Sequence, residues 1–229
     1  MSLRNVARFY PVIAILWLAA CGAGGAGVPG PSPSNGPAGS PKPFLPLALG
    51  NTWTYACYLG PSPGPSTFPK TNTVIGTATV NGTTTFEYQQ QMPISPTQST
   101  TQIQLLANDA EGNTLLYGYV PALGASPSPI VSPTVVIAQV PGPNGTTYDY
   151  PAQNGGTVRR VFCCTENSLP TVYGTFVVDA YFEGSNVLHN APNGYGYAAG
   201  IGSVDEAYNV TDPDPNKHIE CLITATPPR

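Results

Sequence analysis

Five cysteines give this chain its clearest opportunity for side-chain chemistry, and four of them, Cys57, Cys163, Cys164 and Cys221, lie beyond the first fifty residues. Four cysteines in an exported domain are typical of disulfides, and three pairings are possible. A bond between the adjacent Cys163 and Cys164 needs a strained eight-membered ring, so we do not expect it. Because neighbouring side chains in a strand point to opposite faces, we expect these two to bond different partners, with Cys57 and Cys221 as the candidates.

Other residue types that perform catalysis or bind metals do not fall into known motifs. No C-x-x-C pair or nearby histidine accompanies the cysteines, which disfavours a metal site. Neither histidine sits in an H-E-x-x-H motif, and no G-x-S-x-G sequence supplies a nucleophile. Asp205 and Glu206 should face opposite sides of a strand, unlike the paired carboxylates of a glycosidase. We therefore predict no catalytic residue, no metal and no cofactor.

Thirteen tyrosines supply candidates for binding. Tyr117 and Tyr119 lie in the segment LLYGYV, and Tyr195 and Tyr197 lie in NGYGYAAG. Exposed aromatic clusters on a β-surface bind sugars, peptides or lipid chains, whereas most tyrosines of a β-domain pack at sheet edges with the hydroxyl in water. These four are candidate binding residues, with packing as the alternative.

The first twenty residues have the pattern of a secretory signal peptide. Arg4 and Arg8 precede a short apolar stretch, 9–20, that ends in small residues. This stretch is shorter than the roughly 18–20 residues that a membrane-spanning helix needs, and a spanning helix cut short by Pro11 is the alternative.

The sequence LAAC at positions 18–21 resembles the lipobox of bacterial lipoproteins. In that family the cysteine thiol receives a diacylglycerol, cleavage occurs before the cysteine, and the new amino group is acylated with a fatty acid such as palmitate. The resemblance implies that Cys21 is the odd cysteine and carries two or three acyl chains, which attach a protein durably where one chain binds only marginally. By the same analogy, Gly22 permits sorting to the outer membrane if the host is Gram-negative.

A tether and one domain are predicted after the signal peptide. Apart from Val28, Asn35 and Lys42, residues 22–43 are Gly, Ala, Pro or Ser, so the segment 21–43 has nothing to bury and should be disordered. The remainder, 44–229, has the size of one β-domain. Without residues 1–20 the chain has six basic and twelve acidic side chains, a net charge near −6, which disfavours nucleic acid as a partner.

Alternating and β-branched runs recur from residue 51 onward, separated by turn sequences such as VNGT, DAEGN and PGPNGTTY. No window has a sustained helical period. Hairpin-length connections join antiparallel strands, so we predict an all-β fold of ten or so strands: a single curved antiparallel sheet, half-barrel or barrel. The longest predicted strand is 171–184, and the proline-rich stretch 122–133 is predicted as a loop.

Both ends of the predicted domain resemble a family of uncharacterised bacterial envelope proteins, commonly lipoproteins. Their domains open with aromatic-x-Pro-Leu-x-x-Gly-Asn-x-Trp-x-Tyr, which matches residues 44–55 and includes Trp53 and Tyr55. They often close with an "ApGiGlVkeey"-like strand, matched by 198–208 with Ala199 for the usual proline and Asp205 for the usual lysine. The resemblance implies a curved antiparallel sheet or half-barrel and no established activity. Trp53 and Tyr55 share one face of a strand and are candidate binding residues, with core packing as the alternative.

These observations predict a membrane-anchored envelope lipoprotein whose β-domain is a non-enzymatic binding domain for a partner protein or a hydrophobic molecule. Two alternatives stay open: an exported carbohydrate-binding or hydrolytic domain, and a structural component of the envelope. The expected partners are the membrane, through the lipid anchor, and an envelope protein or hydrophobic ligand. Nucleic acid is not expected.

Overall fold

A computed structural model describes residues 42–60, 67–171, 174–184, 193–208 and 218–226 of the chain. These residues all belong to one compact unit, Ser40–Arg229. The predicted signal peptide, Cys21 and nearly all of the predicted tether lie outside the described residues. Within the described ranges, no helix has the length and apolar character needed to cross a membrane.

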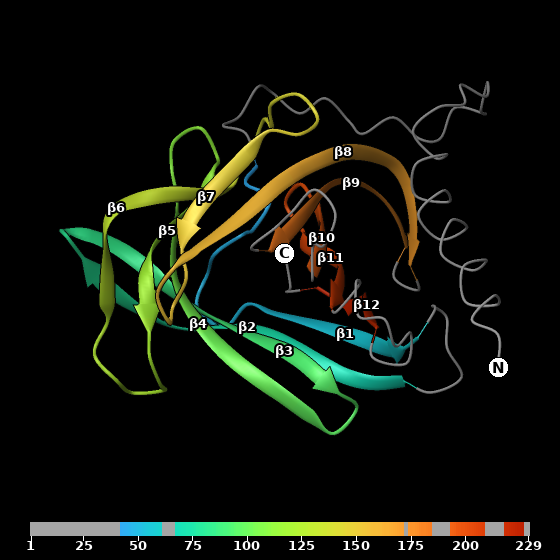
Figure 1. Ribbon diagram of the computed structural model, residues 1–229, viewed down its shortest axis with the longest axis horizontal. Coiled ribbons are helices and arrows are strands. Elements are labelled where there is room, and N and C mark those ends of the chain that lie inside the picture. The colour runs from blue at the N-terminus through green and yellow to red at the C-terminus, as the bar shows by residue number, and fades with distance from the viewer. Residues whose placement is uncertain (1–41, 61–66, 172–173, 185–192, 209–217, 227–229) are drawn as a thin grey trace, which may run out of the picture. The chain divides into compact units, whose positions relative to one another are not determined.

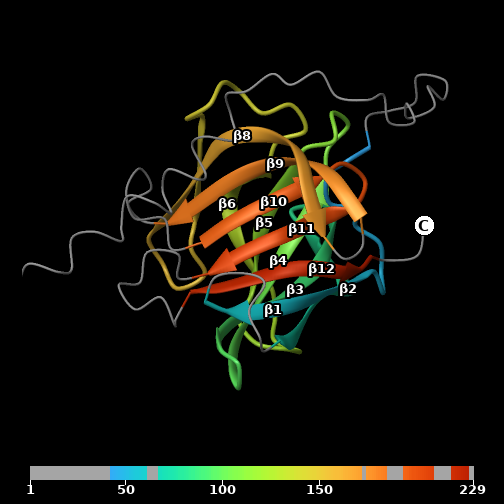
Figure 2. The same cartoon turned by 90° about the vertical axis from the view of Figure 1, so that its right-hand side faces the viewer.

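In the described part of the chain, twelve strands form one antiparallel sheet, which confirms the predicted all-β class. The order across the sheet is β6-β5-β4-β3-β2-β1-β12-β11-β10-β9-β8-β7, so the first and last strands pair in its middle. Figure 1 shows the sheet curving until β8 and β9 lie opposite β1–β4, and Figure 2 shows β8 to β12 and then β1 stacked from top to bottom. The strands are β1 (Thr52–Leu59), β2 (Thr67–Val80), β3 (Thr83–Ser95), β4 (Gln98–Asn108), β5 (Thr114–Val120), β6 (Ser128–Ile137), β7 (Thr147–Pro151), β8 (Thr157–Thr171), β9 (Gly174–Gly184), β10 (Asn193–Ala198), β11 (Gly202–Tyr208) and β12 (Ile219–Ala225).

The pairing of β1 with β12 carries a disulfide between Cys57 and Cys221, which are directly opposite each other in the register. Their sulfurs are 2.07 Å apart, and neither residue is exposed. The prediction that Cys163 and Cys164 take these two residues as partners is therefore wrong. The reason is topological, because sequence spacing does not reveal that the first and last strands are neighbours in the sheet.

Two predicted element boundaries are also wrong. The segment 171–184 is not one strand, because β8 ends at Thr171 and β9 begins at Gly174, with these two residues paired in a hairpin. The predicted loop 122–133 enters β6 at Ser128. Proline is tolerated on an edge strand, where its missing N–H faces no ladder, and β6 is the edge of the sheet.

The core lies on the concave side of the sheet and is rich in aromatic rings. On β1, the alternating residues Trp53, Tyr55 and Cys57 are buried, as the period of a half-buried strand requires. The Trp53 indole N–H donates to the carbonyl of Ile201, and the Tyr55 hydroxyl donates to the carbonyl of Ser203 at 3.0 Å. The large polar rings on β1 are thus tied to the chain around β11.

Candidate functional site

Two oppositely charged side chains meet inside the curved sheet, away from water. Lys70 lies on β2 and Glu206 on β11, with β1 and β12 between them. The Lys70 Nζ is 2.6 Å from Glu206 Oε2, and the two side chains are 2% and 1% exposed. A buried charge is costly unless it is paired and hydrogen-bonded, so the groups around this pair determine whether it is tolerated.

Amide and hydroxyl groups from three strands complete the surroundings of the Glu206 carboxylate. Asn72 Nδ2 donates to Oε1 at 2.9 Å, Gln90 Nε2 donates to Oε2 at 3.3 Å, and the Tyr208 hydroxyl donates to Oε2. Together with Lys70, these groups give the carboxylate four hydrogen-bond donors. We call these five residues the Glu206 network.

Burial and pairing act in opposite directions on the two charged groups. Burial raises the pKa of Glu206, but the charge of Lys70 and the hydrogen bonds outweigh burial, so that the pKa of this carboxyl is lowered. Burial lowers the pKa of Lys70, and Glu206 opposes the change. The Lys70 Nζ also lies 4.2 Å from the centre of the Tyr55 ring, a cation–π contact. Glu206 is therefore held in its charged form and is poorly suited to donate a proton.

Strands β2 and β3 separate beside the Glu206 network. Their ladder ends at Asn72 and Gln90, beyond which residues 67–71 of β2 still pair with β1, and residues 91–95 of β3 still pair with β4 (Figure 1). Side-chain amides bridge the start of the separation. The N–H of Thr71 donates to Gln91 Oε1 at 3.0 Å, and the N–H of Gln91 donates to Asn72 Oδ1 at 3.1 Å.

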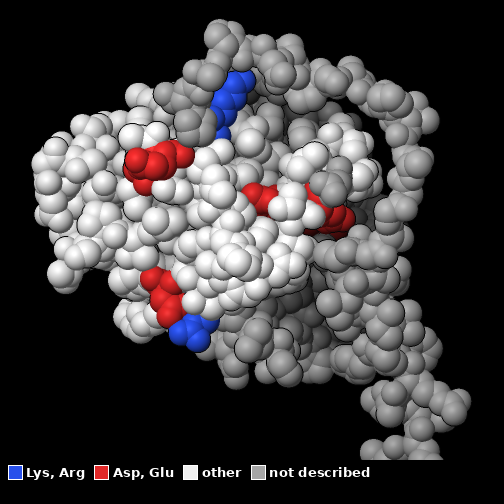
Figure 3. All heavy atoms as spheres, turned by 90° about the horizontal axis from the view of Figure 1, so that it is seen from above, with Lys and Arg blue, Asp and Glu red and all other residues white. Residues whose placement is uncertain are grey.

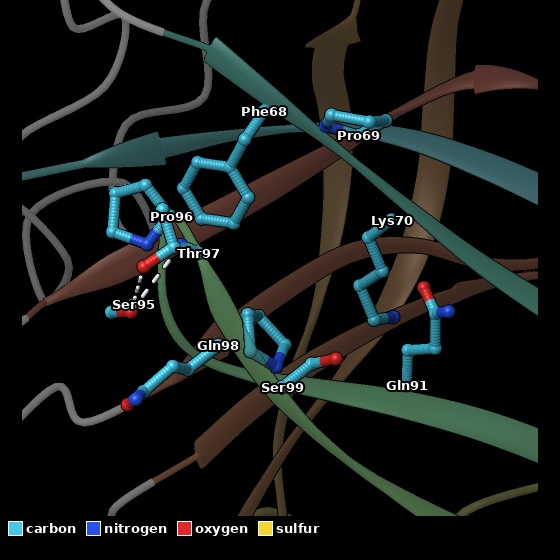
Figure 4. Close-up of a pocket in the computed structure, with 10 residues that line it drawn as sticks. Phe68, Pro69, Lys70, Gln91, Ser95, Pro96, Thr97, Gln98 and Ser99 are labelled. Atoms are coloured by element: carbon cyan, nitrogen blue, oxygen red, sulfur yellow. Dashed lines mark hydrogen bonds between the residues drawn. The ribbon is translucent and has the colours of Figure 1, made fainter.

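The separation contains a cavity of about 210 Å³, which we call the β2–β3 cavity. Figure 4 shows Phe68 and Pro96 at one end and Lys70 and Gln91 at the other. The volume is below the 300–1,000 Å³ typical of sites for drug-sized ligands. The cavity therefore suits a small molecule or one group of a larger one. Its lining residues are Phe68, Pro69, Lys70, Gln91, Pro93, Ser95, Pro96, Thr97, Gln98 and Ser99.

Two prolines set the hydrogen-bonding character of the cavity edges. Backbone N–H and C=O groups of alternate residues point to the same side of a strand, so Pro69 shares the direction of Thr71, and Pro93 shares that of Gln91. Thr71 and Gln91 direct their N–H groups into the separation. The prolines therefore leave carbonyl acceptors and no N–H at these two places. The cavity edges favour a ligand that donates hydrogen bonds and disfavour an added β-strand.

A second buried cation lies at another interruption of the sheet, between the edge strands β6 and β7. Arg160 on β8 donates from Nη1 to the carbonyl of Val136 on β6 at 2.7 Å and from Nη2 to Glu183 Oε2 at 2.7 Å. The Tyr119 hydroxyl on β5 donates to the carbonyl of Pro151 on β7 at 2.7 Å. Side chains thus join the two ends of the sheet, where the described residues form no ladder between β6 and β7.

The aromatic residues predicted as binding candidates are mostly core residues. Trp53, Tyr55, Tyr119, Tyr195 and Tyr197 are all at least 94% buried, and the rings of Tyr195 and Tyr197 stack with centres 6.2 Å apart. The remaining candidate, Tyr117, packs against a separate small cluster that contains Ile103 and Leu105. The structure therefore places five of the six in the packed core and Tyr117, partly buried, against a smaller cluster.

The sequence prediction missed Phe68, Lys70 and Gln91. A signal for Lys70 was present in the sequence. Lys70 and Asn72 lie on the same face of β2 as the apolar residues Phe68 and Val74, so polar side chains occur on the face expected to be buried. Alternation alone does not say which charge on another strand meets them. That information requires the sheet order.

Cations are scarce on the described surface. Lys70 and Arg160 are buried, and Arg159 is bound by Asp149 through two hydrogen bonds of 2.8 and 2.7 Å. Figure 3 shows separate groups of charged side chains on a face that is otherwise uncharged. These residues do not form a basic stripe of the kind that tracks a phosphate backbone.

Comparisons with known proteins give two similar structures. No family model matches the chain, and no curated protein matches it. A "putative exported protein with YmcC-like fold" from Bacteroides fragilis NCTC 9343 has a TM-score of 0.44 and 13% identity, covering 82% of this chain and 100% of its own. A "putative lipoprotein" from Parabacteroides distasonis ATCC 8503 has a TM-score of 0.42 and 12% identity, covering 81% and 98%. At such values the function has to be argued from this chain's own residues.

Proposed function

We propose that the chain is a membrane-anchored envelope lipoprotein, and that its β-domain is a non-enzymatic binding module that holds a small, hydrogen-bond-donating ligand group in the β2–β3 cavity. Cys21 carries the acyl chains, residues 22–43 give the domain reach, and the membrane is the partner at the lipid end. The location is the cell envelope, on the outer membrane if the host is Gram-negative. Nucleic acid is not a partner.

The separation of β2 and β3 is the observation that carries the binding proposal. A sheet gains nothing in stability from losing ladder hydrogen bonds, yet here Asn72 and Gln91 hold the two strands apart with their side-chain amides. The cavity lining includes no histidine, cysteine or carboxylate, and Lys70 is already bound by Glu206. This set of groups favours binding over hydrolysis.

The ligand group belongs either to a partner protein or to a carbohydrate. A volume of about 210 Å³ is too small for a whole lipid, so we do not extend the proposal to a hydrophobic molecule of that size. A carbohydrate is favoured by the lining of the cavity, which combines the aromatic ring of Phe68 with the hydroxyl and amide side chains of Thr97 and Gln98. A sugar ring offers an apolar face for stacking and several hydroxyl donors for the carbonyls.

The anchor is tested by the intact mass of the full-length protein extracted from its own membranes in mild detergent. We expect a chain that begins at Cys21 and carries the mass of the acyl chains. An unprocessed or unacylated chain refutes the lipoprotein part of the proposal and leaves the binding part to be judged separately.

Binding is tested with the full chain in detergent and a panel of monosaccharides, primary amines and amides, by saturation-transfer NMR. Ser99→Trp fills the cavity, and Thr101→Trp, two residues further along the same strand and exposed, is the matched control. We expect a saturable signal in the native chain and in Thr101→Trp that disappears in Ser99→Trp. A signal that survives Ser99→Trp, or no signal with any probe, refutes binding in the cavity.

A further inference from the structure

The ladder between β8 and β9 contains an extra residue at a pair of cysteines. Phe162 pairs with Tyr181, and Cys164 pairs with Ala180, so β8 advances two residues while β9 advances one. Cys163 is therefore the additional residue of a β-bulge. In a regular strand the side chains of Cys163 and Cys164 point to opposite faces, and the bulge removes that separation.

The bulge brings the two sulfurs close together. Cys163 Sγ lies 3.0 Å from Cys164 Sγ, and both residues are half-buried, so a small reagent can approach them. Cys57 and Cys221 are bonded to each other and fully buried. The bulge thus creates the arrangement that the sequence, read as a regular strand, excludes.

The sulfur separation favours a disulfide over a metal chelate. Two thiolates on a tetrahedral zinc ion, each about 2.3 Å from the metal, are separated by about 3.8 Å. The observed 3.0 Å is shorter, and the described residues provide no group of three His, Cys, Asp or Glu side chains placed around a common point. A soft metal would therefore have two protein ligands at an unsuitable spacing.

We propose that Cys163 and Cys164 form a redox site, which a disulfide-bearing oxidant converts reversibly into a vicinal disulfide. The thiolate of one cysteine attacks the oxidant's S–S bond, forms a mixed disulfide and releases the first thiol. The second thiolate then attacks the protein sulfur of the mixed disulfide, closes the Cys163–Cys164 bond and releases the second thiol. The protein loses two protons and two electrons, and the oxidant is reduced to two thiols.

The vicinal disulfide should open more readily than the disulfide of the core. Its ring contains only the two adjacent residues and is strained, whereas the Cys57–Cys221 bond closes a loop of sequence separation 164 and is shielded from reagents. A thiol reductant can therefore open the vicinal bond, and a disulfide-bearing oxidant can reclose it, while the core bond stays intact. The chain would then carry one structural disulfide and one exchangeable disulfide.

The test exposes the folded full chain, prepared with the vicinal pair reduced, to oxidised glutathione and follows it by intact and peptide mass spectrometry. We expect the native chain to lose two hydrogens and two titratable thiols, with Cys163 and Cys164 linked in one peptide and little glutathione adduct. Cys163→Ser and Cys164→Ser should instead stop at a stable adduct on the remaining cysteine. Dithiothreitol should restore the two thiols at a lower concentration than is needed to open Cys57–Cys221.

A relocated pair is the matched control. The double variant Cys163→Ser/Thr165→Cys keeps two adjacent cysteines but moves them past the register shift into regular strand, where they face opposite sides. We expect this variant to accumulate adduct and not to cyclise. Accumulation of adduct on the native chain, no reaction at all, or equal cyclisation by the relocated pair would overturn the proposal. Far-ultraviolet circular dichroism confirms that each variant has folded.

Discussion

The buried pair of Lys70 and Glu206 makes a strong prediction about stability. Each side chain is almost fully buried, and Glu206 accepts hydrogen bonds from four side chains. Removing one member of such a pair leaves an uncompensated buried charge, which costs about 3–5 kcal/mol. We therefore expect Lys70→Met and Glu206→Gln each to lower the free energy of unfolding by about 3–5 kcal/mol.

The double variant is the more informative measurement. In Lys70→Met/Glu206→Gln neither charge remains, the oxygen of the new amide can still accept from Asn72, and its NH2 group can donate to the Tyr208 hydroxyl. We expect the loss in the double variant to be smaller than the sum of the single losses, with a coupling energy of about 0.5–3 kcal/mol. Urea unfolding at pH 7, with the core disulfide intact, measures the free energy of unfolding of the native chain, the two single variants and the double variant.

The pH dependence supplies an independent check with a defined sign. The folded pKa of Glu206 is lowered, so its contribution to stability is present above the unfolded value near 4.3 and is lost as the pH falls through the folded pKa. Glu206→Gln should remove this part of the acid-side loss. The exposed pair of Asp149 and Arg159 is the control, and Asp149→Asn should change stability little. The reasoning is refuted if the losses in unfolding free energy caused by Lys70→Met and Glu206→Gln are additive in the double variant, or if each is below about 1 kcal/mol.

Three further variants test the fold around the site. Cys57→Ala/Cys221→Ala should lower the unfolding free energy by about 2–5 kcal/mol, read from the urea midpoint, because the bond closes a long loop. Gly202→Ala should cost about 2–4 kcal/mol in the same assay, since Gly202 has φ +110° and a Cβ there would lie 2.5 Å from the indole nitrogen of Trp53. Burial raises the folded pKa of Asp205, so native stability should fall as the pH rises from the unfolded value near 3.9, and Asp205→Asn should flatten that fall in thermal unfolding from pH 3 to 8.

Local alternation of apolar and polar residues made the fold class predictable, but it does not determine the order of the strands in the sheet. Trp53 and Tyr55 could be assigned to one face because a strand repeats every two residues, and the structure buries both. The same rule says nothing about β12 lying beside β1, a contact across most of the chain. The Cys57–Cys221 bond and the Lys70–Glu206 pair both depend on that contact, so neither could be read from spacing.

The bulge at Cys163 shows a second limit of the alternation rule. Applied to β8, alternation places Cys163 and Cys164 on opposite faces and separates their sulfurs. One inserted residue reverses the conclusion, and the alternation rule does not show where a residue is inserted. The tyrosines were wrong candidates for a related reason. Alternation identifies residues that share one face of a strand, but whether that face is buried in the core depends on how far the sheet curves.

The two buried cations lie at two of the places where the sheet loses its ladder. Lys70 lies beside the separation of β2 and β3, and Arg160 lies where the edge strands β6 and β7 approach each other. In both places side-chain groups make hydrogen bonds that backbone groups make elsewhere: the amide of Gln91 at the first, and the guanidinium at the second. Backbone held by a few side-chain bonds opens at lower free energy than a continuous ladder does. The β2–β3 cavity therefore lies at a part of the sheet that can adjust to a ligand, while the disulfide between β1 and β12 keeps the neighbouring strands fixed.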